Sequence, residues 1–477
     1  NNMNTTPQKT FPASVCSGTR YFAVILLTTF LFSLLFAGHT LQYPWFYDDY
    51  HTVRPFSIAE IVQTLHGNWD VTGLENATYR PLSALTISIR CFFFGENMEQ
   101  HRLFLLFALS LFYSLIGYAF LITGLRLPFV VGATCFTVIA KSTHVHILML
   151  IAAQHAISGI PIACCCIIAA SNRDGWGTLK KVSIFLLSIT GLCIRETSMV
   201  LFPLIIFFAI LSRNLELEKI FKYEGDVFFK AISICKIGIG VSTPLIISSL
   251  IYIIARSLLV PEAISNINIL GILSHIKMTI FPMGFKSYKL ILYSWVFFLF
   301  CITINLFFYS KPTIIFITKI LLLIFCIFIS CILGIMVVRC DLVMVPAMIF
   351  SFLLAFTIQR ILDDKKNTPS FFVLLVVLFF FSITWQESRK SLLGAHPQSY
   401  QTMISAGMFI YGDYASRAVI PPERKKKGMA YLHTYGIDSD VDLQTKRGDL
   451  MKSAEKNGNF PPAGGGLFIP PSWVLEM

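Results

Sequence analysis

The stretch "YFAVILLTTFLFSLLFA", residues 21–37, decides the fold class because it is an apolar run without a single charge. A run in the range of about 17–25 such residues can cross the hydrocarbon core of a bilayer as a helix. Lys9 and Arg20 precede the run and small residues follow it, as in a signal peptide. Many more apolar runs come later, so we interpret it as an uncleaved first transmembrane helix.

The rest of the chain has the same character. Its 477 residues are 55% hydrophobic and 13% charged, and its mean hydropathy is +0.69. This is too apolar for an ordinary soluble protein. The formal net charge of +12 is spread over short loops rather than collected on one basic arm, so we expect no nucleic-acid partner. The composition predicts an all-α polytopic integral membrane protein.

Further apolar runs of spanning or near-spanning length follow, and with the first they predict about eleven transmembrane helices. They fall at about residues 103–122, 127–142, 148–170, 181–194, 197–211, 231–259, 290–309, 313–335, 342–361 and 371–386. We expect these helices to form one transmembrane domain over residues 21–386.

The distribution of Lys and Arg predicts the orientation of these helices. If residues 1–20 are cytoplasmic, so are the basic loops, such as "SNRDGWGTLKK" and "QRILDDKKN", as the positive-inside rule requires. The first outer loop, residues 39–102, has four Arg against seven Asp and Glu. The polar segment 387–477, rich in Gly and Pro near its end, then lies outside as well. It is either a small domain or an extended arm.

The outward ends of the predicted helices gather ionisable residues on one side. Ionisable groups near a membrane are costly, which makes each a functional candidate. A partly desolvated carboxylate can act as a base towards a hydroxyl, and arginines can bind a phosphate. The pattern therefore indicates group transfer from a lipid phosphate. The residues are Asp48, Asp49, Lys141, His144, His146, His155, Arg195, Glu196, Arg339 and Asp341.

Structural interpretations of the same residues stay open. The two aspartates can form a solvated turn, and Arg195 and Glu196 can end one helix and begin the next. The three histidines can be interfacial or hydrogen-bonded side chains. No short-spaced cluster of Cys, His or Asp predicts zinc, so we expect no metal or other cofactor.

Several motifs in order resemble a known family. The first outer loop reads "YDDYHTV" (47–53), "HGNWDV" (66–71) and "TYRPLSALTISIRCFFFGENMEQHRLFLLFAL" (78–109). It is followed by "STHVHILML" (142–150), "LCIRETSMVLFPL" (192–204), "SHIKMTIFPMGF" (274–285) and "RCDLVMVPAMIFSFLLA" (339–355). This set resembles the membrane half of the GT-C glycosyltransferases, most closely the O-mannosyltransferases with tetratricopeptide repeats and their bacterial relatives. The resemblance covers about residues 20–386.

The resemblance implies a GT-C-like helical bundle with an outward-facing site, a polyprenyl-phosphate sugar as donor, and inversion at the anomeric carbon. Asp48 or Asp49 would deprotonate the acceptor hydroxyl. Arg195, in place of the family's Lys, would meet the lipid phosphate with Glu196 orienting it, and Arg339 would be a second phosphate contact. The remaining site-lining residues would be Arg80, which would support the loop, and His144, His146 and His155.

Only one of the two aspartates can face a donor. Adjacent side chains point to opposite sides of an extended segment and diverge by about 100° in a helix. We favour Asp48 as the base, which leaves Asp49 free to cap the following segment.

Under this resemblance the acceptor would be a protein, a lipid-linked glycan or a surface polymer, and the sequence does not decide among them. We expect a bacterial inner membrane, with loop 39–102 and the C-terminal segment in the periplasm, or alternatively the endoplasmic reticulum membrane. The competing hypothesis is a catalytically silent structural subunit of a larger membrane assembly, whose C-terminal segment, with "ERKKKG" (423–428), contacts protein partners. A transporter would predict inverted repeats and helices broken at mid-membrane, and the sequence shows neither.

Overall fold

The computed structural model of the chain is helical in its described parts, which contain no strand. These parts are residues 15–43, 45, 49–72, 78–140, 143, 147, 150–172, 175–213, 227–260, 314–335, 344–363, 378, 381, 382, 384–386 and 400–456. The predicted all-α class is confirmed for this portion of the chain.

Among those residues, four helical segments are long and apolar enough to cross a membrane, namely Gly18–Gln42, Met98–Ile122, Ala153–Ala170 and Gly238–Leu259. They belong to α1 (Val15–Ala37) with η1 (Gly38–Gln42), α5 (Met98–Ile122), α8 (Ala153–Ala170) and α12 (Val227–Leu259). This supports an integral membrane protein, with fewer qualifying helices in the described residues than the eleven predicted.

Other predicted spans are helices as well. They are α6 (Leu127–Ile139), α9 (Thr178–Ile194), η4 (Glu196–Leu201) with α10 (Phe202–Leu211), α15 (Ile314–Ile335) and α16 (Met344–Asp363). The predicted run 290–309 and most of 371–386 lie outside the described residues. The predicted run 148–170 is divided into the short η3 (Leu150–Ala152) and α8.

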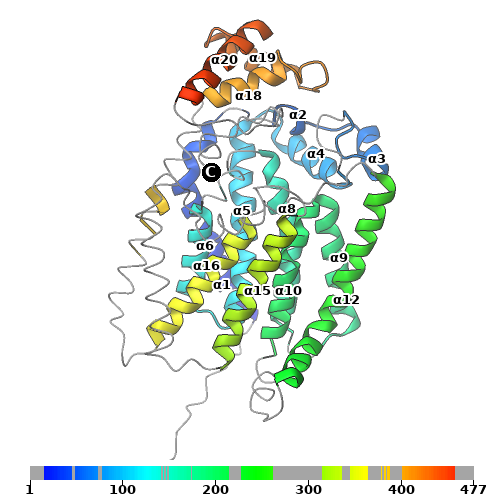
Figure 1. Cartoon of the computed structure of the whole chain (residues 1–477), viewed down its shortest axis with the longest axis vertical. Helices are drawn as coiled ribbons and strands as arrows, with labels where there is room; N and C mark the ends of the chain where they lie inside the picture. Colours follow the sequence, from blue (N-terminus) through cyan, green and yellow to red (C-terminus); the bar gives the residue numbers. More distant parts are fainter. Residues whose placement is uncertain are drawn as a thin grey trace, which may run out of the picture.

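Helix α5 lies at the centre of the bundle, in contact with α1, α6 and α8 (Figure 1). Helix α8 also contacts α9 and α10, while α16 packs on α6 and α15. Small residues allow these close approaches. A Cβ on Gly159 would lie 2.7 Å from the Phe112 ring of α5, and one on Gly191 of α9 would lie 2.9 Å from the Ser158 carbonyl oxygen.

The first loop folds over one end of this bundle. It contains α2 (Asp49–Thr52), α3 (Ile58–His66) and α4 (Ser83–Phe94). Helix α3 begins at a capping box, in which Ser57 and Glu60 each bind the other's backbone N–H. Helix α4 contacts α3, α5 and α9, so the loop is held to the ends of the transmembrane helices.

The C-terminal part folds onto the same end of the molecule (Figure 1). Its helices are α18 (Tyr400–Ile410), α19 (Pro422–His433) and α20 (Asp440–Lys456). Helix α18 packs on α19, α20 and α2. Apolar side chains are buried between them, including Ala406, Phe409, Leu432 and Leu443. This part of the predicted tail is thus a set of packed helices that contacts the first loop.

Candidate functional site

Asp49, the first residue of α2, connects that helix to the start of η3, about a hundred residues later in the chain. Its Oδ2 accepts the Leu150 N–H at 2.8 Å, and its Oδ1 accepts the Ile151 N–H at 2.8 Å. The first N–H groups of a helix have no partner inside it, and a carboxylate both binds them and favours the positive end of the helix dipole. The side chain is fully buried.

Two arginines surround this carboxylate. Arg90 of α4 donates to the Leu150 carbonyl at 2.9 Å, and Arg102 of α5 donates to the Tyr43 carbonyl at 3.2 Å. Burial raises the pKa of the Asp49 carboxyl above its ordinary value, while the two N–H groups and the two guanidinium groups act to lower it. Both carboxylate oxygens are thus bound by backbone N–H groups and buried, so the group is not exposed to a substrate.

A second buried ion pair joins the first loop to η4. Arg80 Nε donates to Glu196 Oε2 at 2.7 Å, and Arg80 Nη2 donates to Glu196 Oε1 at 2.6 Å. Both side chains are about 5% exposed. A bidentate pair of this kind fixes orientation as well as distance. The Glu196 carboxylate, which the sequence predicts to orient Arg195, thus binds Arg80 of the first loop through both of its oxygens.

Arg195 precedes Glu196 in the chain, and His155 is brought to the same helix by a contact with Thr197. Arg195 is the residue between α9 and η4 and is buried, with its backbone N–H on the Gly191 carbonyl at 2.9 Å. His155 of α8 lies with Nδ1 3.1 Å from the Thr197 hydroxyl of η4. The structure thus brings Arg195, Glu196 and His155 into one region.

Hydrogen bonds of the backbone and of two side chains hold α4 against this region. The Leu82 N–H donates to the Cys193 carbonyl at 3.0 Å, and the Ser83 hydroxyl donates to the Ile194 carbonyl at 2.5 Å. Thr86 donates to the Gln154 side chain at 2.8 Å. The segment from Tyr79 to Leu82 therefore leads directly onto the end of α9.

Arg424 of α19 connects the C-terminal helices to the acidic stretch. Its guanidinium binds both carboxylate oxygens of Glu96 at 2.9 Å, and Nη1 also donates to the carbonyls of Asp49 and Tyr50 at 2.8 and 3.1 Å. The same group lies 3.5 Å from the centre of the Trp45 ring. Such a site stabilises a buried cation through hydrogen bonds, an opposite charge and an aromatic face.

His51 makes a second connection between these segments. Its Nδ1 accepts the Val419 N–H at 3.0 Å, so the Nε2–H faces Asp70 Oδ1 at 3.2 Å. Asp70 also accepts the Thr72 hydroxyl at 2.8 Å. Every polar group in this small network has a partner, which is typical of a buried structural network.

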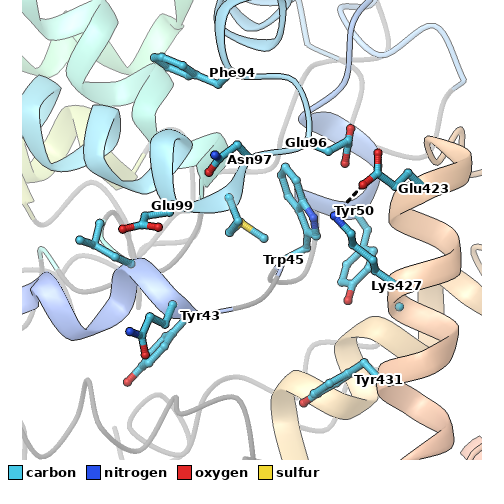
Figure 2. Close-up of a pocket in the computed structure, with 14 residues that line it drawn as sticks. Tyr43, Trp45, Tyr50, Phe94, Glu96, Asn97, Glu99, Glu423, Lys427 and Tyr431 are labelled. Atoms are coloured by element: carbon cyan, nitrogen blue, oxygen red, sulfur yellow. Dashed lines mark ion pairs between the residues drawn. The ribbon is translucent and has the colours of Figure 1, made fainter.

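A pocket of about 710 Å³ opens between the first loop and α19 (Figure 2). Its walls come from η1, the stretch around Trp45 and Tyr50, the α4–α5 turn and the outward face of α19. Glu96, Glu99 and Glu423 carry its negative charge, and Lys427 its positive charge. We call it the α5–α19 pocket. Asp49 does not line it, and its carboxylate binds η3 instead.

Six of the predicted candidates lie outside the described residues, namely Asp48, Lys141, His144, His146, Arg339 and Asp341. Across the residues the structure does describe, no group of three or more His, Cys, Asp or Glu is placed to hold a metal ion. The predicted residues placed by the structure are Asp49, Arg80, His155, Arg195 and Glu196.

The sequence interpretation missed the three arginines at 90, 102 and 424. Arg90 and Arg102 carry a recognisable signal, because each is a cation within an apolar helix and such residues are costly unless they have a function. Arg424 carries none, since it is one of several cations in "ERKKKG". Only its place on α19 distinguishes it from the exposed Lys425 and Lys426.

Comparison with known proteins provides no identity for the chain. No protein-family model matches it, and no curated protein matches it either.

Proposed function

We propose that the chain is a GT-C-like membrane glycosyltransferase that moves a sugar from a polyprenyl-phosphate donor to an acceptor hydroxyl with inversion. The observation that carries the proposal is the gathering of buried charges from distant segments at one end of an apolar bundle. Asp49, Arg80, Arg90, Arg102 and Glu196 are each 5% exposed or less. Charges of this kind are expensive near a membrane and mark functional regions.

The full architecture under this proposal has about eleven membrane helices. The described α1, α5, α8 and α12 are four of them. The charged end, with the first loop and the C-terminal helices, faces the periplasm of a bacterial inner membrane, or the lumen in the endoplasmic reticulum alternative.

We assign the base to Asp48 and a positioning role to Asp49. Both oxygens of Asp49 already accept a backbone N–H, and the side chain is fully buried. It holds the start of α2 against η3, and Asp48 is the residue that precedes it in the chain. The sequence also favours Asp48 as the base and expects Asp49 to cap the segment that follows it. In the structure the Asp49 side chain instead binds the N–H groups of η3.

The proposed reaction is a single displacement. The Asp48 carboxylate takes the proton from the acceptor hydroxyl as its oxygen forms a bond to the anomeric carbon. The bond from that carbon to the phosphate oxygen breaks, and the electron pair leaves with the polyprenyl phosphate. Arg195 and Arg339 offset the charge that develops on the phosphate. Glu196 and Arg80 hold the backbone of η4 and thereby the position of Arg195.

Sugar transfer measured in membranes tests the assignment. A radiolabelled polyprenyl-phosphate sugar is supplied to membranes with the wild-type chain, Asp48→Asn or Asp413→Asn, the last being an exposed control. We expect Asp48→Asn to lose transfer by a factor of about 10²–10⁴, the usual contribution of a general base. Transfer at the wild-type rate by Asp48→Asn would overturn the base assignment.

The burial of Asp49 is the observation that favours the second candidate, a structural subunit that keeps the fold without the reaction. On that view the wild-type chain transfers no sugar and still carries the ion pairs described above. The C-terminal helices then contact the first loop of the same chain, so that only their remaining outer faces are available to protein partners. The same assay separates the candidates, because a structural subunit gives no labelled product from any donor.

A further inference from the structure

We propose that the α5–α19 pocket binds a neutral oligosaccharide, the part of the acceptor next to the hydroxyl that receives the sugar. The role as acceptor site rests on the proposed function, whereas the binding itself can be measured alone. The pocket volume of about 710 Å³ lies within the range of about 300–1,000 Å³ typical of small-molecule sites.

The lining offers the two kinds of surface that a sugar requires. Phe94, Met98 and Tyr431 are half-buried and provide apolar surface for the C–H face of a sugar ring. Gln42 and Asn97 are exposed and provide amide donors and acceptors for hydroxyl groups. Figure 2 shows Asn97 and Glu99 on the same side of the pocket and Tyr431 on the opposite side, on α19.

The charges in the pocket favour a neutral ligand. Glu96 is bound by Arg424, and Glu423 is paired with Lys427 at 2.7 Å. Glu99 lies at the exposed start of α5 and is the lining carboxylate that has no ion-pair partner among the residues the structure describes. An anionic ligand would be repelled by three carboxylates. A polycation would gain little attraction, because Glu96 and Glu423 are already paired with Arg424 and Lys427.

The location of the pocket connects it to the proposed reaction. Tyr50 and Trp45 both line it, and they flank the acidic pair in the chain. Tyr50 follows Asp48 by two residues. The proposed base and the wall of the pocket therefore belong to one short stretch, which Arg424 holds through the carbonyls of Asp49 and Tyr50.

Filling the pocket with a large side chain gives the sharpest test. Glu99→Trp occupies the pocket, whereas Gln100→Trp adds the same ring at the next exposed residue of α5, which does not line it. The full-length chain in detergent micelles is titrated with fluorescent neutral oligosaccharides, with the same oligosaccharides carrying carboxylates, and with an oligolysine peptide.

We expect the wild-type chain and Gln100→Trp to bind the neutral oligosaccharides with equal affinity. Glu99→Trp should weaken that binding at least about tenfold, which corresponds to about 1.4 kcal/mol. The proposal is overturned if the neutral oligosaccharides do not bind, if Glu99→Trp binds them as well as the wild type, or if the chain prefers the carboxylated set or oligolysine.

The same preparations are assayed for sugar transfer, so that two failures can be distinguished. Transfer by a chain that does not bind neutral oligosaccharides overturns the pocket inference and leaves the proposed function intact. Binding that Glu99→Trp removes, in a chain without transferase activity, supports a glycan site and overturns the proposed function. Asp48→Asn should bind the oligosaccharides like the wild type, since it removes no group that lines the pocket.

Discussion

The guanidinium of Arg424 lies 3.5 Å above the ring of Trp45, in a site where it also holds Glu96 and the backbone of the acidic stretch. Residues separated by more than 300 positions in the chain thus form one buried unit. This relationship makes the C-terminal helices part of the candidate site, because they determine where the first loop lies.

Arg424→Met should destabilise the protein by about 3–5 kcal/mol, since removing one partner leaves the other charge poorly compensated. Two backbone carbonyls also lose their donor. Thermal unfolding in detergent, followed by intrinsic fluorescence, measures the effect as a lower melting temperature. The matched control is Lys425→Met, an exposed position on the same helix. Equal melting temperatures for the two variants would contradict the role given to Arg424.

Asp49→Asn should also destabilise the chain, by about 1–3 kcal/mol, because an amide offers one oxygen where the carboxylate offers two. One of the N–H groups of Leu150 and Ile151 then loses its acceptor. Hydrogen exchange at these two amides is the direct measurement, and faster exchange in Asp49→Asn than in Asp413→Asn is expected. Unchanged protection would mean that the carboxylate does not hold η3.

The pair Arg80–Glu196 should behave as a coupled unit. Arg80→Met and Glu196→Gln each leave a buried charge without its partner, at a cost of about 3–5 kcal/mol. The double variant Arg80→Met/Glu196→Gln should lose clearly less than the sum of the two. A double-mutant cycle of unfolding free energies measures this difference. Strict additivity would show that the two groups contribute independently.

Glu60 should make the first loop sensitive to acid. The hydrogen bond from Arg54 lowers its pKa from 4.5 to about 2, with further contributions from Ser57. A carboxyl whose folded pKa is depressed contributes stability that is present above its unfolded pKa and is lost as the pH falls through the folded value. Stability should therefore decline between pH 4.5 and about 2.

Glu60→Gln removes this titration and should flatten the decline over the same interval. The measurement is the melting temperature of both proteins in detergent as a function of pH. If the variant and the wild type lose stability with the same slope between pH 4.5 and about 2, the ion pair with Arg54 does not have the proposed effect.

Much of the bundle follows from local sequence. The uncharged run 21–37 lies within α1, and the run 103–122 lies within α5, because an apolar segment of that length has no better conformation in a membrane. The run 148–170 is where local reasoning fell short. The structure has η3 near its start, where Asp49 binds two backbone N–H groups. Because these partners are about a hundred residues apart, the local sequence does not predict the contact.

The sequence predicts candidate residues at outward helix ends, but it does not predict the contacts that these residues make. Outward helix ends indicated that Asp49, Arg195 and Glu196 share one side. The bidentate contact of Glu196 with Arg80 and the insertion of Arg424 depend on how the loop and α19 dock, which charge patterns alone do not specify. In "ERKKKG", helical periodicity directs Arg424 inward and leaves its neighbours in solvent.

The contacts of Arg424 also impose an order on biosynthesis. Asp49 emerges from the ribosome 375 residues before Arg424 does. Until α19 has been translated, Glu96 lacks this cation, and the face of Trp45 that Arg424 covers has no such partner. The first loop therefore reaches its final arrangement among the last steps of synthesis, long after α1 has been made.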